Sequence, residues 1–568
     1  MFDRDIHSAS VSIYKDEAFP LISACGQGGA WVSAGRGGSL DTKGLRLLQE
    51  LTDAELELIR VDIGALGPDR VGREYVAVTA ADGAVLHGTL TRPQEVNPRP
   101  VIVIRTPYGR SELDGAAAYL SSRGYAVLVQ DTRSATSYFS EAGDGRSTAD
   151  WATSQSWCDG TLLLAGFSYL GFTAWATAST RPPALRAMSI AEYSTDRVSA
   201  WYPGGALTLD LALSWSLQNE ANSSEPHPPA DAFDVLPLGD AGEAAAGGPL
   251  PFFRERLMHG ADSSHWAPLD YSSTAEDAGI PVLLFDGWYD YQRIPLFQDF
   301  ERLGRMGAPR RLVFGPWTHN PIEMTRYLDE TLTWFDLHAK GMGTAPAEAS
   351  LYDTGARGWV EFDRWPANPP QQVFHATPNR LLSVEPVEGS TFIGWAYDPD
   401  DPTPAVGLTA FGGLEVGGPQ DNRTLLDRSD TVVFTADPLA EDLDAVGRVR
   451  VRSTVRSDAP STDFFVRLLD VTADGVAANV CDAICRVTDP QLSSSNGVVV
   501  ELDLGPIAHR FLAGHRPAVL VASGAYPYYD RNLGFGDPLL TAVRRRIAHP
   551  SVCIGGTDGL SITLTLRQ

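Results

Sequence analysis

The chain has few cysteines for its length. Five cysteines are scattered over 568 residues, which is too few for a disulfide scaffold. Cys481 and Cys485 form a C-x3-C pair, but no second cysteine pair or nearby histidine completes a zinc set. We therefore interpret the cysteines as structural thiols.

Basic residues are also scarce. The sequence has 45 Lys and Arg against 71 Asp and Glu, giving a formal net charge of −26. Nucleic acids and anionic membrane surfaces bind through clusters of Lys and Arg, so this balance argues against both as partners. We expect a small-molecule partner, and a homodimer remains open.

Long apolar runs are missing too. No stretch approaches the ~18 apolar residues that span a membrane. The opening sequence MFDRDIHSAS lacks the basic and apolar regions of a signal peptide. We therefore expect a cytoplasmic location.

The length favours two to four domains. Residues 1–70 are difficult to interpret, although apolar spacing predicts a helix around 43–60 that packs on the main body. Composition changes along the rest of the chain. The domains expected from these changes are an N-terminal extension (1–70), a core in two pieces (71–189 and 276–345), an insertion between them (190–275) and a C-terminal domain (346–568).

The core combines short apolar runs with helix-like segments. Such runs are typical of parallel strands covered by helices on both faces. The insertion is rich in Trp, Ala, Leu and Pro and is predicted to be a helical cap. After residue 345 short alternating runs predict a β-sandwich or jelly roll. The expected fold class is thus α/β, with an α/β-hydrolase core, an inserted helical cap and a C-terminal β-sandwich.

One serine lies where a predicted strand meets a predicted helix. Gly166-Phe-Ser168-Tyr-Leu-Gly171 comes after the apolar run 162–165 and precedes the helix-compatible stretch 170–180. A serine on such a sharp turn is exposed above the sheet, as in a nucleophile elbow. The motif departs from G-x-S-x-G because Leu170 occupies the place of the second glycine. Alone, this motif is moderate evidence for a catalytic serine.

A nucleophilic serine needs a base, and the base needs an orienting carboxylate. In this fold the chain order is Ser, acid, His, with the last two after strands. Asp290 and His319 both come after apolar runs in that order. The sequence separating Ser168 from Asp290 is long, and the predicted cap accounts for it. Rival residues are Asp286 for the acid, and His265 and His338 for the base.

Several further motifs resemble the CocE/NonD hydrolases, a family that includes cocaine esterase, α-amino acid ester hydrolases and Xaa-Pro dipeptidyl-peptidases. The resemblance covers roughly residues 72–568. The matching stretches are Arg105-Thr-Pro-Tyr108, Gly124-Tyr125 through Gln130-Asp-Thr-Arg133, Trp157-Cys-Asp-Gly160, Gly166 to Gly171, Trp201-Tyr-Pro-Gly-Gly-Ala206, Gly287-Trp-Tyr-Asp290, Gly315-Pro-Trp-Thr-His319 and Asp530-Arg-Asn532.

The resemblance implies roles for individual residues. Ser168, Asp290 and His319 would form the catalytic triad. The oxyanion hole would consist of the Tyr108 hydroxyl and the backbone N–H of Tyr169. The cap tryptophans Trp201 and Trp215 lie where cap aromatics line the acyl pocket of cocaine esterase. As a bare pattern, these two are equally compatible with the core of the cap.

The residues directly after Asp290 constrain the substrate. Family members that act on α-amino acid esters carry acidic residues at these positions, to hold the substrate ammonium. Here the positions are occupied by Tyr291, Gln292 and Arg293, so we place Tyr291 and Arg293 in the substrate pocket and expect Arg293 to repel a cation. This favours a neutral or anionic acyl group, although a cap carboxylate such as Asp210 or Glu220 is an alternative anchor for a cation.

The resulting hypothesis is a serine hydrolase that cleaves esters or amides through an acyl-enzyme, without metal or cofactor. An acyltransferase would use the same residues and a different acceptor. A dipeptidyl-peptidase is a further alternative. A fourth hypothesis is an inert core with a carbohydrate-binding jelly roll, since fold alone does not fix function. The purpose of residues 1–70 stays open.

Overall fold

The computed structural model describes three short strands within the first 70 residues, and then residues 71–567 except 96, 222, 224–226, 262, 278, 320–321 and 408–416. The three strands, β1 (Ser10–Ile13), β2 (Ile22–Cys25) and β3 (Trp31–Ala34), pair antiparallel in sequence order. The helix predicted around 43–60 lies outside the described residues.

The core contains one ten-stranded sheet, in the order β13-β12-β11-β10-β9-β8-β6-β7-β5-β4. Its central strands, from β7 to β12, are parallel, and antiparallel strands complete both edges. The strands are β4 (Val71–Thr79), β5 (Val85–Pro93), β6 (Arg99–Thr106), β7 (Ala126–Asp131), β8 (Cys158–Phe167), β9 (Leu185–Ala191), β10 (Val282–Tyr289), β11 (Arg310–Thr318), β12 (Ala349–Asp353) and β13 (Gly358–Phe362).

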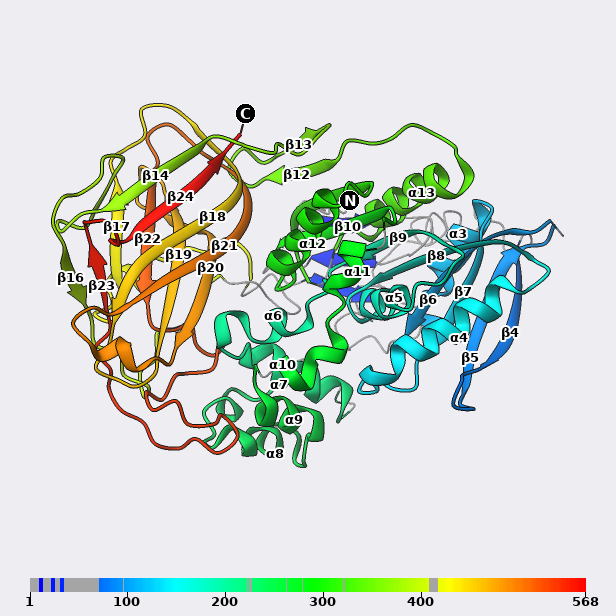
Figure 1. The fold of residues 1–568 in the computed structure, drawn as a ribbon, viewed down its shortest axis with the longest axis horizontal. Helices are drawn as coiled ribbons and strands as arrows, with labels where there is room; N and C mark the ends of the chain where they lie inside the picture. The colour runs from blue at the N-terminus through cyan, green and yellow to red at the C-terminus, as the bar shows by residue number, and fades with distance from the viewer. Residues whose placement is uncertain are drawn as a thin grey trace, which may run out of the picture.

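Helices cover both faces of this sheet (Figure 1). Because side chains alternate along a strand, Val101 and Val103 join one apolar cluster while Ile102 and Ile104 join another on the opposite face. The first cluster includes residues of α4 (Glu141–Thr153), α5 (Tyr169–Ser179) and α12 (Arg293–Arg305), and the second includes residues of α3 (Asp114–Ser122) and α13 (Met324–Lys340). Burial on both faces explains why the central strands are apolar throughout. The α/β-hydrolase fold class is confirmed.

A helical cap is inserted between β9 and β10, where the change in composition predicted an insertion. Its apolar residues, including Trp201, Leu213 and Phe253, belong to the same cluster as those of α5, so cap and sheet share a continuous core. The cap helices are α6 (Arg197–Trp201), α7 (Leu209–Asn219), α8 (Ala241–Ala246), α9 (Pro251–His259), α10 (Ser263–Trp266) and α11 (Ser272–Asp277). Figure 1 shows α7 to α10 gathered at one end of the molecule.

The C-terminal domain is an antiparallel β domain with its own apolar core. The sequence pattern predicts that this domain starts at residue 346. However, β12 pairs parallel with β11, and β13 pairs with β12. These two strands therefore extend the first sheet to Phe362. The domain's strands are β14 (Gln371–Ala376), β15 (Leu381–Ser383), β16 (Thr391–Gly394), β17 (Val432–Ala436), β18 (Leu443–Arg456), β19 (Thr462–Val471), β20 (Ala477–Val487), β21 (Val498–Phe511), β22 (Arg516–Ala522), β23 (Ser551–Ile554) and β24 (Ser561–Leu566).

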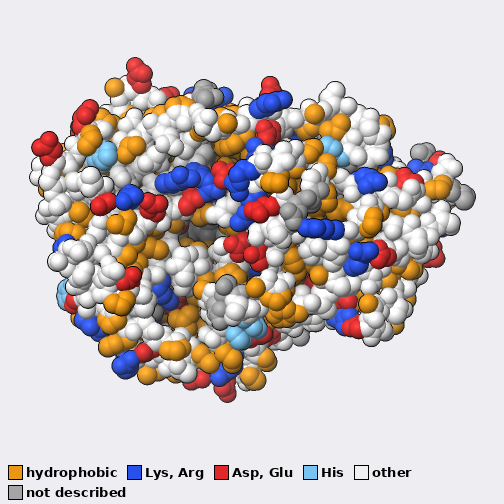
Figure 2. All heavy atoms as spheres, viewed as in Figure 1, with side chains coloured by type: hydrophobic (Ala, Val, Ile, Leu, Met, Phe, Trp, Pro, Cys, Tyr) orange, Lys and Arg blue, Asp and Glu red, His pale blue; other side chains and the backbone are white. Residues whose placement is uncertain are grey.

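The β domain packs closely against the cap. A side chain at Gly204 would overlap the Ile484 carbonyl, so glycine is required for this approach. The Leu207 N–H donates to the Asp530 carboxylate at 2.7 Å, and Arg486 pairs with that carboxylate at 2.9 Å. Charged side chains of both signs also gather between the β domain and the sheet domain (Figure 2). Gly204 and Asp530, which belong to two of the motifs found in the sequence, therefore hold the cap against the β domain.

None of the helices in the described part of the chain combines the length and apolarity that a membrane span requires.

Candidate active site

Ser168 lies in a sharp turn between β8 and α5, with φ 51° and ψ −127°. Its N–H donates to the Ala191 carbonyl of β9 at 2.9 Å. A Cβ at Gly166 would overlap the Leu170 carbonyl, and one at Gly171 would lie 2.9 Å from the Tyr193 Cβ. Both glycines are therefore required by close packing, which explains why the second glycine comes one residue later than in G-x-S-x-G.

A continuous hydrogen-bond chain connects Ser168 to His319 and Asp290. The His319 Nε2 lies 2.8 Å from the Ser168 Oγ, and its Nδ1 lies 2.6 Å from the Asp290 Oδ2. The other Asp290 oxygen accepts the Gln292 N–H at 2.6 Å. A carboxylate can only accept, so Nδ1 carries the proton and Nε2 is free to accept one from the serine. Asp290 and His319 are both buried.

The rival residues lie in other positions. Asp286 is buried next to Asp290, and its Oδ1 accepts the Gly287 N–H at 2.7 Å. His338 packs against Trp334 on α13, with ring centroids 4.2 Å apart. His265 belongs to the cap and pairs with a glutamate there. None of the three takes part in the chain that ends at Ser168.

Aromatic side chains surround the serine. Tyr169 begins α5, so its backbone N–H is one of the first-turn donors that have no partner within the helix. The Tyr108 ring packs edge-on to the Tyr169 ring, with centroids 6.3 Å apart. Tyr108 is 42% exposed, and desolvation of its hydroxyl raises its pKa above the usual value. The hydroxyl therefore keeps its proton at neutral pH and can donate it.

Tyr291 contacts the base directly. Its hydroxyl lies 3.4 Å from the His319 Nε2, and the two ring centroids are 4.6 Å apart. Burial, followed by the nearby Asp290 charge, raises the pKa of Tyr291 well above its usual range. The side chain is a neutral wall of the site next to the reacting serine.

Arg293 does not face this site, contrary to the expectation that it would repel a cationic substrate. Its Nη1 and Nη2 donate to the Pro506 and Leu504 carbonyls of β21, at 2.7 and 3.0 Å. Gly505 lies against the same guanidinium, where a side chain would approach within 2.6 Å of Ile294. The arginine tethers α12 to the β domain, because the first turn of α12 packs on β21 and directs the side chain there.

The two cap tryptophans lie at different depths. Trp215 contacts Tyr138 at 6.2 Å between centroids, and Tyr138 in turn contacts Tyr169 at 5.4 Å, so Trp215 lies near the site. Trp201 packs behind Trp215, with centroids 6.3 Å apart, and its face stacks on the Arg256 guanidinium.

Two buried arginines of the cap were missed by the sequence analysis. The Arg256 guanidinium lies 3.5 Å from the Trp201 ring centroid and 4.0 Å from that of Phe252. The Arg197 guanidinium lies 3.6 Å from the Tyr138 centroid, and its Nη1 donates to the Tyr193 hydroxyl at 2.7 Å. Among the described residues, neither forms a salt bridge with a carboxylate. The sequence signal for these two residues is that each is an isolated arginine within a stretch rich in aromatic residues.

Neither cap carboxylate considered as an anchor for a cation is free to act as one. Glu220 accepts the backbone N–H groups of Phe252 and Phe253 at 2.7 and 3.2 Å, capping α9. Asp210 accepts the Ser214 hydroxyl at 3.1 Å, and burial raises the pKa of its carboxyl. The cap therefore presents buried guanidinium groups and engaged carboxyls.

Glu192 is a third residue that the sequence analysis missed. It comes directly after β9 with φ 53°, is fully buried, and neither carboxyl oxygen has a hydrogen-bond partner among the described residues. One oxygen lies within 4.8 Å of ligand-type atoms of both Asp290 and His319. Burial, then the charges of Asp290 and Asp286, raises the pKa of Glu192 well above its usual value. In the sequence, Glu192 is a single glutamate after an apolar run, and this pattern does not indicate a functional residue.

Comparison with known proteins agrees with this geometry. Residues 82–321 match the family described as X-Pro dipeptidyl-peptidase (S15 family), and residues 340–544 match the C-terminal non-catalytic domain of X-Pro dipeptidyl-peptidases. The chain is 29% identical to the cocaine esterase of Rhodococcus sp. (strain MB1 Bresler), over 83% of this chain and 95% of the esterase. These matches identify the chain as a serine hydrolase that resembles the CocE/NonD family.

Solved structures share the fold of this serine hydrolase. An α-amino acid ester hydrolase aligns with a TM-score of 0.76 at 20% identity, covering 88% of this chain and 97% of that one. A CocE/NonD family hydrolase from Staphylococcus aureus aligns with a TM-score of 0.64 at 17% identity, covering 87% of this chain and 94% of that one.

We predict that Glu192→Gln stabilises this serine hydrolase increasingly as the pH rises. In the unfolded chain the carboxyl loses its proton near its ordinary pKa of 4.5, whereas the folded protein retains it. Folding therefore takes up a proton above that pH, and wild-type stability falls as the pH rises toward the folded pKa. The glutamine side chain does not titrate, so it adds no such pH dependence to the free energy of unfolding. Urea unfolding between about pH 5 and pH 8 should show a widening gap between the two midpoints.

Glu388→Gln, at an exposed glutamate of the β domain, is the matched control and should leave the pH dependence unchanged. A Glu192→Gln variant that is less stable than wild type across the whole range would mean that Glu192 is ionised in the folded protein.

Proposed function

We propose that this chain hydrolyses carboxylic esters through an acyl-enzyme on Ser168. The observation that carries the proposal is the hydrogen-bond chain from Ser168 through His319 to Asp290. In it a serine hydroxyl, a correctly oriented imidazole and a buried carboxylate lie within 2.8 Å of their partners.

The proposed reaction proceeds in two acyl-transfer steps. His319 Nε2 takes the Ser168 proton as Oγ attacks the carbonyl carbon, and the carbonyl oxygen becomes an oxyanion. The Tyr108 hydroxyl and the Tyr169 N–H stabilise that charge. When the ester C–O bond breaks, His319 gives its proton to the leaving alcohol. His319 then deprotonates a water that attacks the acyl group, and the serine regains its proton as the acid leaves.

The first test labels the nucleophile. A fluorophosphonate probe should form one adduct at Ser168, located by mass spectrometry of the digested protein. Ser168→Ala should lose both the adduct and the turnover of p-nitrophenyl esters. Ser179→Ala, at a serine at the other end of α5, is the matched control and should keep both. Equal turnover by wild type and Ser168→Ala would overturn the proposal.

The second test concerns the oxyanion. Tyr108→Phe retains the ring and removes the hydroxyl donor, so we expect kcat to fall by on the order of 10²-fold with little change in KM. Steady-state kinetics on one p-nitrophenyl ester measures this split. Tyr75→Phe, at an exposed tyrosine of β4, should behave as wild type. A Tyr108→Phe variant with unchanged kcat would remove the tyrosine from the oxyanion hole.

The acyl group accepted by the site is proposed to carry a negative charge. Tyr138 connects the serine to the cap, with its ring 5.4 Å from Tyr169 and 4.8 Å from Phe252 between centroids. Arg197 and Arg256 lie over these rings, and the buried Arg256 Nη2 has no hydrogen-bond partner in the described part of the chain. A buried guanidinium without a carboxylate is costly in an apolar site, and a substrate carboxylate would offset that cost.

This charge distribution separates the proposal from dipeptidyl-peptidase activity. A substrate with a free ammonium group needs an anion at the site. The cap places the Arg197 and Arg256 guanidinium groups over the rings of Tyr138 and Phe252, whereas Glu220 is used to cap α9.

The third test compares two p-nitrophenyl esters of nearly equal size, the charged 4-carboxybenzoate and the neutral 4-carbamoylbenzoate. Wild type should prefer the carboxylate in kcat/KM by about tenfold or more, the range expected for a charge-assisted hydrogen bond. Arg256→Met keeps the stem and removes the charge, so the preference should fall toward unity. Arg254→Met, on the exposed face of α9, is the matched control. A wild type that prefers the carbamoyl compound would overturn the assignment.

A further inference from the structure

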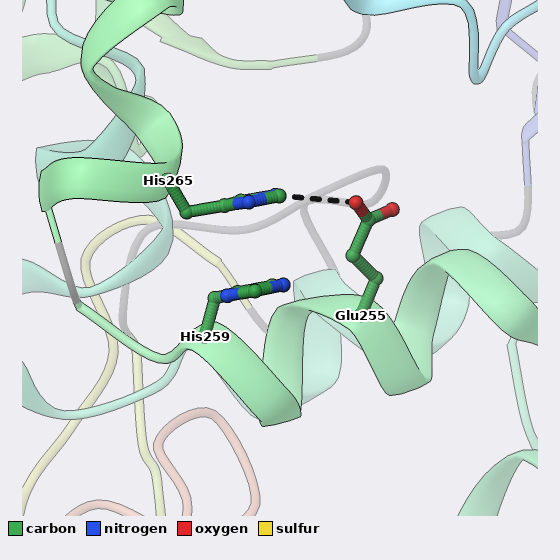
Figure 3. Close-up of side chains that lie close together, drawn as sticks. All are labelled: Glu255, His259 and His265. Carbon is green, nitrogen blue, oxygen red and sulfur yellow. Dashed lines mark ion pairs between the residues drawn. The ribbon is translucent and has the colours of Figure 1, made fainter.

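Three side chains that can bind a metal converge in the cap, outside the site described above (Figure 3). Glu255 and His259 lie four residues apart on α9 and therefore share one face of the helix. His265 approaches them from α10. One ligand atom from each of the three lies within 4.8 Å of the others.

Hydrogen bonding within the protein leaves part of this cluster unsatisfied. The His265 Nε2 lies 3.1 Å from the Glu255 Oε1, yet the direction is not that of a hydrogen bond. Within the residues that the structure describes, this buried nitrogen has no other partner. The His259 and His265 rings stack with centroids 3.5 Å apart and planes within 1° of parallel. One carboxylate thus faces two adjacent imidazoles. The cluster has more imidazole nitrogens than this carboxylate can bond, and a cation would coordinate them.

We propose that Glu255, His259 and His265 bind a divalent transition-metal ion, with Zn²⁺ the expected occupant. Two imidazoles and one carboxylate are a donor set that zinc accepts, with a fourth position left for water. Because the stacked rings direct their lone pairs side by side, binding requires each ring to rotate until both nitrogens face the ion. Half-buried side chains at the end of a nine-residue helix allow such a rotation.

The ion can reach this cluster from solvent. His259 lines a hollow of about 320 Å³ between the cap and the β domain, together with Met258, Gly260 and Ala261. The other face of the cluster is closed by aromatic side chains. Phe139 packs edge-on to His265 at 5.7 Å between centroids, and Trp266 does so at 4.5 Å.

Bound metal would connect α9 to α10 across the short link that begins at Gly260. Trp266, next to His265, lines a small cavity with Arg197, Trp201 and Arg256. The ion would therefore restrain the segment of the cap that carries the buried arginines. Its role in this arrangement is structural, and the inference is independent of the proposed ester chemistry.

The experiment uses full-length protein without a polyhistidine tag, stripped with EDTA and then titrated with Zn²⁺ by calorimetry. Wild type should bind one Zn²⁺ per chain, and its thermal midpoint should rise with added Zn²⁺. Glu255→Gln, His259→Gln and His265→Gln should each weaken binding by more than about tenfold. The same site loaded with Co²⁺ should show the visible absorption of a four-coordinate ion, lost in His265→Gln.

His549→Gln is the matched control, because His549 pairs with Asp458 at 3.0 Å in the β domain without a second histidine in that pair. It should leave stoichiometry and affinity unchanged. Wild type that binds no Zn²⁺, or binding that survives all three cap substitutions, would overturn the proposal. Circular dichroism of the metal-free variants, expected to match metal-free wild type, separates loss of the site from loss of folding.

Discussion

The turn at Ser168 is held in a left-handed backbone conformation, and the surrounding structure is organised to keep it there. The Ala191 carbonyl of the adjacent strand accepts the Ser168 N–H, and the close packing at Gly166 and Gly171 fixes the helix that begins after the serine. Strain of this kind costs about 1–3 kcal/mol and persists only when neighbouring elements determine it. Because β8, β10 and β11 are parallel neighbours through β9, the loops after them meet at one edge and bring His319 to the strained serine.

Buried charge is the second constraint on the site. Asp290, Asp286 and Glu192 lie close together without solvent, and three like charges at such a distance cannot all ionise. Asp290 accepts hydrogen bonds from His319 and from the Gln292 N–H, whereas both oxygens of Glu192 lack partners among the residues described. The negative charge therefore resides on Asp290, and raised pKa values keep the other two carboxyls protonated. A single carboxylate orients the imidazole.

Local sequence pattern was sufficient for features that depend on chain order. Apolar runs located the central strands, and strand ends located Ser168, Asp290 and His319. Features set by tertiary contacts could not be predicted. Arg293 comes shortly after the acid in sequence, yet packing on β21 directs it away. Strands β12 and β13 resemble the later β domain in pattern, but β12 pairs with β11 and β13 pairs with β12. Arg197 and Arg256 acquire their role only because aromatic rings from distant segments enclose them.

Helix α9 connects the two proposals about the cap. Phe252, Phe253 and Arg256 are buried on its inner face, while Glu255 and His259 occupy a half-buried face beside them. Arg256 stacks between rings at 3.5 and 4.0 Å, so a small shift of α9 would change how its guanidinium meets an acyl group. The helix is short, and Gly260 comes directly after its last turn. An ion coordinated by Glu255, His259 and His265 would restrain that turn, and with it the position of the buried positive charge.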